Sequence, residues 1–121
     1  MVKKKKVIIC AALTGGPTTK NNNPNVPYTP EEYAQECLHC YQEGASIVHL
    51  HAKDPASGFA TMDVEVHRKI LDAVRAKSPE LIINISTGSA MDTPEVRIRP
   101  VEVLRPEMCS FNTNSMNFGL S

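Results

Sequence analysis

Ile47-Val48-His49-Leu50-His51 predicts a β-strand, because it is too short for a stable helix and is rich in apolar and β-branched residues. Similar apolar runs occupy residues 7–13 and 81–85, and a weaker one occupies residues 108–112. Nearly continuous apolar runs are typical of parallel sheets, whose strands are buried on both faces. The sequence therefore predicts four parallel strands.

Three helices are predicted between these strands, and the first has the clearest start. Thr29-Pro30-Glu31-Glu32 places Thr29 at the N-cap, a proline in the first turn, and Glu32 where it can close a capping box. Gly44 can adopt the left-handed conformation that commonly follows a helix. We therefore expect the first helix to run to Gly44.

The other two helices carry signals of the same kind. Asp63 is the expected N-cap of the second helix, and Pro79 stops it. Thr93 opens the third helix, which we expect to be interrupted at Pro100 and to end before Pro106. Strands and helices thus alternate along the chain, which predicts a parallel α/β fold with right-handed crossovers.

This order is compatible with an open doubly wound sheet or with a barrel. Neither a G-x-G-x-x-G nor a G-x-x-x-x-G-K-[ST] motif follows the first strand, so the usual sign of a nucleotide-binding open sheet is missing. An eight-stranded barrel needs about 250 residues, whereas this chain has 121. We predict a (β/α)8 TIM barrel of which residues 1–121 form the N-terminal half, with roughly the first four strands, and of which the C-terminal half is absent.

The charge balance excludes some classes of partner. Thirteen Lys and Arg residues balance 13 Asp and Glu residues, so no overall field favours nucleic acid or an anionic membrane, and we expect a small-molecule partner. Residues 7–13 are too few to span a bilayer, and no signal-peptide cleavage pattern follows them. We therefore expect a cytoplasmic protein.

The two histidines of the second strand are the candidate metal ligands. Because side chains alternate along a strand, His49 and His51 point to one face while Val48 and Leu50 point to the other. In a barrel, the histidines project inward at the C-terminal end of the strand, where barrel active sites lie. Two neutral imidazoles so placed can bind one zinc ion at roughly 2.0–2.1 Å. The alternative, a pair of hydrogen-bonded core histidines, stays open.

A catalytic zinc usually has three protein ligands. His39 and His67 fall on predicted helices, where we expect both side chains to be solvated outside the barrel. The third ligand is therefore expected in the absent half.

Polar pairs also end the next two strands. Asn84 and Ser86 share one face of the third strand, and Ser110 and Asn112 share one face of the fourth. Burial of such groups is costly unless they meet a metal, a ligand or one another. The same parity on three neighbouring strands therefore predicts a binding site at their C-terminal ends.

The loops at this edge have their own signals. The turns at residues 14–16 and 87–89 are small and rich in hydroxyl groups, and their backbone amides could receive carboxylate or phosphate oxygens. Residues 17–29 form a longer loop than a strand-to-helix connection requires. This loop either folds over the site or is a tolerated surface insertion.

Several motifs, taken in order, resemble those of a known family. They are Ala11-Ala12-Leu13-Thr14-Gly15-Gly16, Pro27-Tyr28-Thr29-Pro30-Glu31-Glu32, Gly44-Ala45-Ser46-Ile47-Val48-His49-Leu50-His51, Asn84-Ile85-Ser86-Thr87-Gly88, Leu104-Arg105-Pro106-Glu107-Met108 and Asn117-Phe118-Gly119. The set is similar to the β-keto acid cleavage enzymes, whose founding member is the 3-keto-5-aminohexanoate cleavage enzyme of lysine fermentation. The match covers nearly the whole chain.

The resemblance implies a zinc-dependent (β/α) barrel that reacts a β-keto acid with acetyl-CoA, giving acetoacetate and a new CoA thioester. It implies that His49 and His51 bind zinc, which would polarise the keto group as a Lewis acid. The positions that match substrate-contacting or nearby polar residues of the family are Ser86, Ser89, Ser110 and Asn112. The family's glutamate ligand belongs to the later half, so we expect this polypeptide alone to be inactive. We also expect the full-length parent to be a homo-oligomer.

One departure from the family concerns the substrate. Pro17 stands where the aminohexanoate enzyme has a glutamate that faces the substrate amino group. Because proline offers no carboxylate, an amino-substituted β-keto acid is disfavoured. Two other interpretations stay open: a different metal-dependent TIM-barrel hydrolase or aldolase, and a non-catalytic truncated half-barrel that folds only by pairing.

Overall fold

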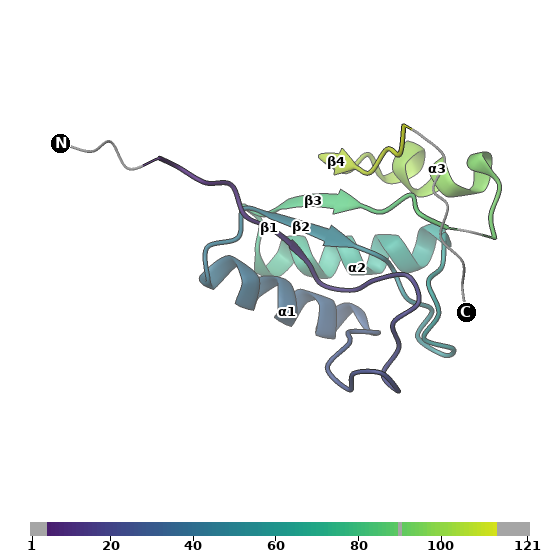
Figure 1. Ribbon diagram of the computed structural model, residues 1–121, viewed down its shortest axis with the longest axis horizontal. Helices are drawn as coiled ribbons and strands as arrows, with labels where there is room; N and C mark the ends of the chain where they lie inside the picture. Colours follow the sequence, from purple (N-terminus) through teal and green to yellow (C-terminus); the bar gives the residue numbers. More distant parts are fainter. Residues whose placement is uncertain (1–4, 90, 114–121) are drawn as a thin grey trace.

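The structure, a computed structural model, describes residues 5–89 and 91–113. Its elements in chain order are β1 (Cys10–Ala12), α1 (Pro30–Gln42), β2 (Ile47–Leu50), α2 (Val64–Lys77), β3 (Ile82–Ile85), α3 (Pro94–Leu104) and β4 (Met108–Cys109). The four strands are parallel and lie in the order β1-β2-β3-β4 (Figure 1). The predicted α/β fold is confirmed, while the motif at residues 117–119 lies outside the described residues.

The register of the sheet brings the strand ends together. His49 pairs with Ala12 of β1 on one side and with Asn84 of β3 on the other. The side chains of Val48 and Leu50 are 0% and 2% exposed, whereas His49 between them is half-buried. The predicted alternation is therefore correct, and it places His49 on the face away from the core.

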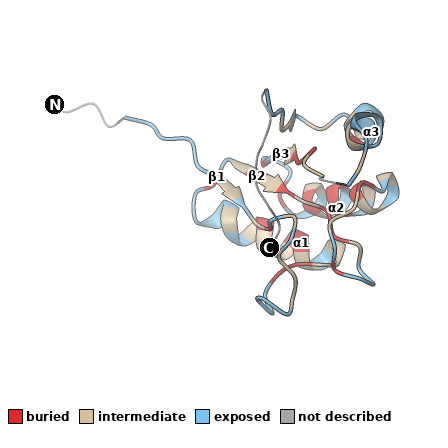
Figure 2. Cartoon of the chain, turned by 45° about the vertical axis from the view of Figure 1, so that its right-hand side comes forward, coloured by how far each residue is buried: buried red, intermediate tan, exposed pale blue. Residues whose placement is uncertain are grey.

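The core lies between the sheet and the first two helices. Helix α1 begins with the predicted capping box, because the Thr29 side chain accepts from the Glu32 amide while the Glu32 carboxylate accepts from the Thr29 amide. Helix α2 begins at Asp63, whose carboxylate accepts from the Val66 amide. The buried residues gather where these helices meet the sheet (Figure 2), and the largest on the two helices are Tyr33, Ile70 and Leu71.

The expected interruption of the third helix at Pro100 is wrong. Helix α3 continues through Pro100 to Leu104 and ends where Arg105 adopts a left-handed conformation, with φ of 47°. A proline removes one backbone hydrogen bond from a helix. The Pro100 ring is fully buried, and the removal of its apolar surface from water offsets that loss.

The outer strands are shorter than the apolar runs that predict them. Backbone pairing with β2 limits β1 to three residues, and Val7 and Ile8 extend past the sheet into solvent. The fourth strand has only two residues. Among residues 5–89 and 91–113, each outer strand pairs with a neighbour on one side only, so fewer of its residues are held in the sheet.

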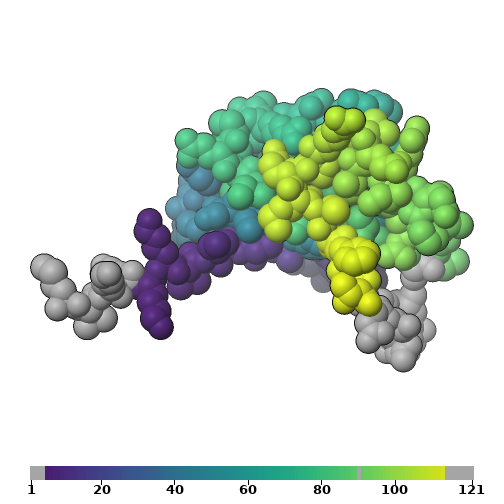
Figure 3. Space-filling view, turned by 90° about the horizontal axis from the view of Figure 1, so that it is seen from above, coloured from purple at the N-terminus to yellow at the C-terminus, as the bar shows by residue number. Residues whose placement is uncertain are grey.

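The uncovered face of the sheet is hollow. Helices α1 and α2 lie together on one side of the strands, and the space-filling view shows an arch whose hollow lies on the other side (Figure 3). No helix of the described ranges 5–89 and 91–113 is long and apolar enough to cross a membrane.

Candidate metal and substrate site

His49 and His51 lie side by side at the C-terminal end of β2. Their ring centres are 5.2 Å apart and the ring planes meet at 81°. A zinc ion bonded to a ring nitrogen at about 2.0–2.1 Å lies roughly 3.2 Å from the ring centre, so two rings on one ion must be closer than about 6.4 Å. The spacing of this pair meets that limit.

The hydrogen bonds of the pair leave one nitrogen of His49 available. The Asn84 amide oxygen can only accept, so His49 Nδ1 donates to it at 3.3 Å. This bond orients the ring and, in the neutral tautomer with its proton on Nδ1, leaves the Nε2 lone pair for a metal. Nδ1 of His51 is buried without a hydrogen-bond partner.

His51 is held in the neutral form that binds metals. Burial is the main cause that lowers its pKa to about 4, and the electrostatic influence of the neighbouring His49 and Lys53 lowers it further. A neutral imidazole can give its lone pair to a metal without first losing a proton. The donor set therefore fits zinc as a pair.

The backbone of His51 is fixed by two hydroxyl groups. Its carbonyl oxygen accepts from Thr14 Oγ1 at 3.1 Å and from Tyr33 Oη at 2.6 Å. Burial raises the pKa of the Tyr33 phenol, so the donating proton stays in place. The ring lies between two glycines, since a Cβ on Gly16 would lie 3.7 Å from Nδ1 and a Cβ on Gly88 would lie 3.8 Å from Cε1.

Lys53 is the most unusual side chain near the site. It is 0% exposed, and its Nζ donates to the carbonyl oxygens of Gly16 at 2.7 Å and Thr18 at 2.8 Å. Burial lowers the pKa of its ammonium group. Within the described part of the chain it forms no ion pair.

The long loop at residues 17–29 does not cover the histidines with its outer part. The ring of Tyr28 packs on Gly58 of the β2–α2 loop, where an added Cβ would lie only 2.1 Å from Tyr28 Oη. The Tyr28 hydroxyl also accepts from the Lys20 amide at 2.8 Å. Gly16, which directly precedes the loop, lies near His51, since an added Cβ there would be 3.7 Å from His51 Nδ1.

Two of the predicted polar residues join the histidines. Asn84 bonds His49, as described above. Ser86 is buried next to Gly88, whose amide donates to Ser86 Oγ at 3.2 Å, and a Cβ added to Gly88 would lie 3.8 Å from the His51 ring. The predicted meeting of polar groups from β2 and β3 is therefore present.

The other predicted polar residues bond elsewhere. Ser89 donates to Asp92 at 2.6 Å within the β3–α3 loop. Ser110 Oγ accepts from the Thr87 amide at 2.9 Å, which ties β4 to the end of β3. Asn112 lies in a separate cavity, so these three residues do not contact the histidines in this structure.

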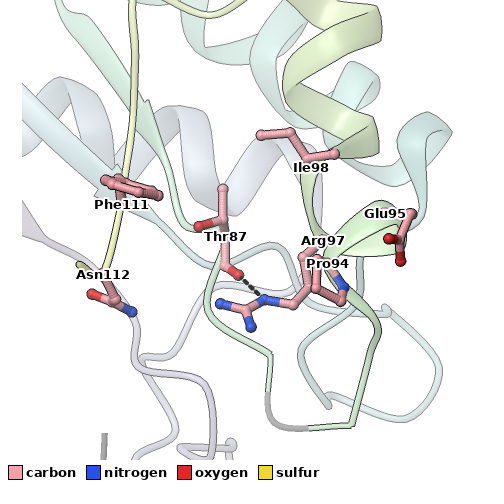
Figure 4. A pocket seen from close by; sticks show the side chains of 7 residues that line it. All are labelled: Thr87, Pro94, Glu95, Arg97, Ile98, Phe111 and Asn112. Carbon is pink, nitrogen blue, oxygen red and sulfur yellow. Dashed lines mark hydrogen bonds between the residues drawn. The ribbon is translucent and has the colours of Figure 1, made fainter. Parts of the chain in front are cut away.

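That cavity has a volume of about 490 Å³ and lies between α3 and the segment after β4 (Figure 4). Arg97 Nε donates to the Thr87 carbonyl at 2.6 Å, which aims the guanidinium group across the cavity. Phe111 on its opposite side is 83% exposed. Neither histidine of the β2 pair lines it.

Both His39 and His67 were expected to be solvated, which is correct for His39 and wrong for His67. His67 is 2% exposed because it lies on the core face of α2, three residues before Ile70. Its Nδ1 donates to the Asp63 carbonyl at 2.8 Å, which satisfies one of its two nitrogens during burial. Sequence periodicity could have shown this, since His67 shares the spacing of the apolar face.

Thr14, Tyr33 and Lys53 were not predicted to support the site. Thr14 had a signal, because it follows the first strand at the same edge as the histidines. Tyr33 and Lys53 had none, since a single sequence does not show that a lysine is buried.

Within residues 5–89 and 91–113, no group of three His, Cys, Asp or Glu side chains could hold a metal ion. The histidine pair is therefore at most part of a metal site.

The fold and the site define a class: a parallel α/β protein with a histidine pair at the C-terminal end of its second strand. Residues 6–121 match the family described as beta-keto acid cleavage enzyme. The chain belongs to the beta-keto acid cleavage enzyme family.

Curated relatives agree with this assignment. The chain is 45% identical over 102 residues to the 3-keto-5-aminohexanoate cleavage enzyme of Fusobacterium nucleatum subsp. nucleatum, covering 84% of this chain and 37% of the relative. It is 40% identical over 103 residues to the 3,5-dioxohexanoate:acetyl-CoA acetone transferase of Paraburkholderia graminis, covering 84% of this chain and 33% of the relative. The chain thus spans about a third of the length of these relatives.

A solved structure shares the fold. The complex of ObcA with oxaloacetate matches with a TM-score of 0.53 and 24% identity, over 62% of this chain and 20% of that chain. At this level of identity the match supports the fold alone.

Proposed function

We propose that His49 and His51 are two of the zinc ligands of an enzyme that reacts a β-keto acid with acetyl-CoA, giving acetoacetate and a new CoA thioester. The observation that carries this proposal is the pair itself: two rings on one strand face, 5.2 Å apart, with the Nδ1 proton of His49 held by Asn84. Membership of the family and the acetyl-CoA transferase among the relatives supply the reaction class.

Zinc, when bound, would act as a Lewis acid on the keto group of the substrate. The chain's own residues prepare the site for this. His51 is kept neutral by burial, and Thr14 and Tyr33 fix its backbone carbonyl. A rigid strand end gives the pair the fixed geometry that metal catalysis requires.

The polar residues near the strand ends are the proposed substrate contacts. Ser86 is the best supported, because its hydroxyl bonds the Gly88 amide and Gly88 lies near the His51 ring. We extend the proposal to Ser89, Ser110 and Asn112, whose present partners are other protein groups or the separate cavity. Pro17 favours a β-keto acid without an amino substituent, and one relative is named for such an acid, 3,5-dioxohexanoate.

The remaining parts of the site are proposed to come from elsewhere. We infer that residues 1–121 are the N-terminal half of a (β/α)8 barrel and that a glutamate of the C-terminal half is the third zinc ligand. Without it, the chain alone should be inactive, and the full-length parent is proposed to be a homo-oligomer. A cytoplasmic location stays a prediction from the sequence.

Zinc titration of the chain tests the metal pair. Competition with a chromophoric chelator should show binding of one zinc ion, and His49→Ala or His51→Ala should weaken it by at least tenfold. His39→Ala is the matched control, since His39 is exposed on α1 and should leave the affinity unchanged. Equal affinity in all variants would contradict the assignment.

The reaction is tested on the full-length parent. Loaded with zinc and given acetyl-CoA plus a panel of β-keto acids, it should release acetoacetate. Absence of acetoacetate across the panel, with zinc bound, would exclude the reaction.

A second candidate is a non-catalytic half-barrel that folds by pairing. The hollow uncovered face and the two-residue β4 favour it, because unpaired strand edges promote association. Size-exclusion chromatography distinguishes the cases: a clean monomer that unfolds cooperatively would contradict the half-barrel account.

A further inference from the structure

The buried Lys53 ammonium has no carboxylate partner among the residues that the structure describes. Burial of an ammonium group is costly, and a second charge usually compensates for it. Here the described contacts of Nζ are two carbonyl oxygens, those of Gly16 and Thr18. A buried cation that depends on two backbone oxygens fixes the segment that supplies them.

The position of Lys53 itself is rigid. Its backbone forms an antiparallel bridge with Ala60, and the Asp54 amide donates to the Phe59 carbonyl at 2.8 Å. The Thr61 amide donates to the Ala52 carbonyl at 3.0 Å on the other side. Lys53 therefore extends from a closed hairpin that follows β2, two residues after His51.

The segment that Lys53 holds, residues 14–18, lies next to the His51 ring. Gly16 lies against that ring, and its carbonyl is one of the two that Lys53 binds. Thr14, two residues earlier, donates to the His51 carbonyl. The chain from Thr14 to Thr18 is thus fastened at three points to the end of β2, and two of the three are made by one ammonium group.

We propose that Lys53 is a positioning residue for the metal pair: it holds residues 14–18 against the His51 ring and so keeps that ring in its metal-binding orientation. This inference rests on the proposed metal site for its functional meaning. The contact between the loop and His51 does not depend on the metal. The ordering of residues 14–18 by Lys53 and the binding of the metal can therefore be tested separately.

Lys53→Met tests the proposal, because methionine keeps the apolar stem and removes the ammonium. In backbone ¹⁵N relaxation of the chain, the order parameters of Gly16 and Thr18 should fall from about 0.85 to below about 0.6. Zinc affinity should fall by about tenfold, the usual effect of losing a group that orients a ligand. Lys69→Met, at an exposed position on α2, is the matched control and should change neither.

Lys53→Arg keeps donors for both carbonyls and should retain an ordered loop and a zinc affinity within about threefold of the parent chain. Unchanged order parameters and unchanged affinity in Lys53→Met would overturn the proposal. If that variant does not fold, a disordered loop in a folded Lys53→Arg variant would overturn it instead. A parent chain that binds no zinc would contradict the proposed function, while the order parameters would still decide the role of Lys53.

Discussion

The N-terminal side of the sheet, formed by β1, α1, β2 and α2, has more buried residues than the C-terminal side, formed by α3 and β4. Helices α1 and α2 bury seven residues between them, whereas α3 buries only Pro100. Strand β2 has a neighbour on each side, while β4 has two residues and pairs only with β3 among the described residues. The histidine pair lies on the N-terminal side, and the proposed metal site would need ligands fixed in this way.

Helices α1 and α3 begin with the same three residues, Thr-Pro-Glu, but only the threonine of α1 caps its helix. Thr29-Pro30-Glu31 is followed by Glu32, which closes the capping box of α1. Thr93 at the start of α3 is followed three residues later by Val96, and its side chain caps nothing. The shared Thr-Pro-Glu motif therefore forms a capping box only where a glutamate follows it, as Glu32 does in α1.

Truncation of a core residue should separate the two sides most strongly. Leu71→Ala in α2 removes a side chain that is 2% exposed, so we expect a loss of about 2–5 kcal/mol in the free energy of unfolding, measured with urea. Val103→Ala in α3 is the counterpart, at an exposed position, and should cost less than about 0.5 kcal/mol. Equal losses would remove the distinction between the sides.

The loops of the N-terminal side interlock through Gly58, so adding one methyl group there should be costly. Gly58 has φ of +74°, and its new Cβ would meet the Tyr28 ring. We expect Gly58→Ala to cost about 2–4 kcal/mol, from left-handed strain and the clash together, measured by urea unfolding.

Two further variants identify the cause. Gly15→Ala adds a Cβ whose nearest neighbour is 3.5 Å away, so it should have little effect. In a Tyr28→Ala background, which has no ring to clash with, Gly58→Ala should cost only the backbone strain relative to Tyr28→Ala alone. A Gly58→Ala variant as stable as the parent would show that these loops do not interlock.

Removing the N-cap threonine of α1 or of α3 should cause smaller losses of stability, and the two losses should differ. Thr29→Ala removes a capping hydrogen bond and should lower the free energy of unfolding by about 1 kcal/mol. Thr93→Ala removes no cap and should lower it by at most a few tenths of a kcal/mol. Thermal or urea unfolding measures both, and a larger loss at Thr93 would reverse the comparison.

The smallest expected effect is the pH dependence of the α1 cap. Hydrogen bonds from Lys20 and the Tyr28 amide lower the pKa of Glu32 to about 2 from 4.5. A lowered folded-state pKa adds stability that is present above pH 4.5 and is lost as the pH falls toward 2. Because the side chain is 40% exposed, solvent screening limits this contribution to about 1 kcal/mol.

The measurement is urea unfolding at several pH values. The stability difference between the parent chain and Glu32→Gln should be about 1 kcal/mol at pH 6 and should vanish near pH 2. Glu31→Gln, exposed in the same helical turn, is the control. A difference that stays constant with pH would argue against an ionic contribution.

Local signals predicted most of the fold because they depend on neighbours in sequence. The capping box at Thr29, the cap at Asp63 and the left-handed Gly44 all form between residues a few positions apart. The alternation that separates Val48 from His49 is equally local. These features need no knowledge of the rest of the chain.

The misses depend on tertiary packing. Pro100 stays inside α3 because its ring is buried, and His67 is buried because α2 turns that position toward the core. Lys53 is buried because its ammonium group donates to two carbonyls that lie 35 and 37 residues earlier in the chain. Such contacts form only when separate elements meet, and no short motif predicts them.

The order of the strands has a consequence for how the chain folds. Each strand pairs with the one that precedes it in sequence, so no contact in the sheet has to wait for a distant segment. During synthesis, β2 meets an edge that β1 has already supplied, and β3 then meets β2. Structure can therefore grow vectorially from the N-terminus, and the histidine pair is shaped as soon as the second crossover helix has packed and β3 has arrived.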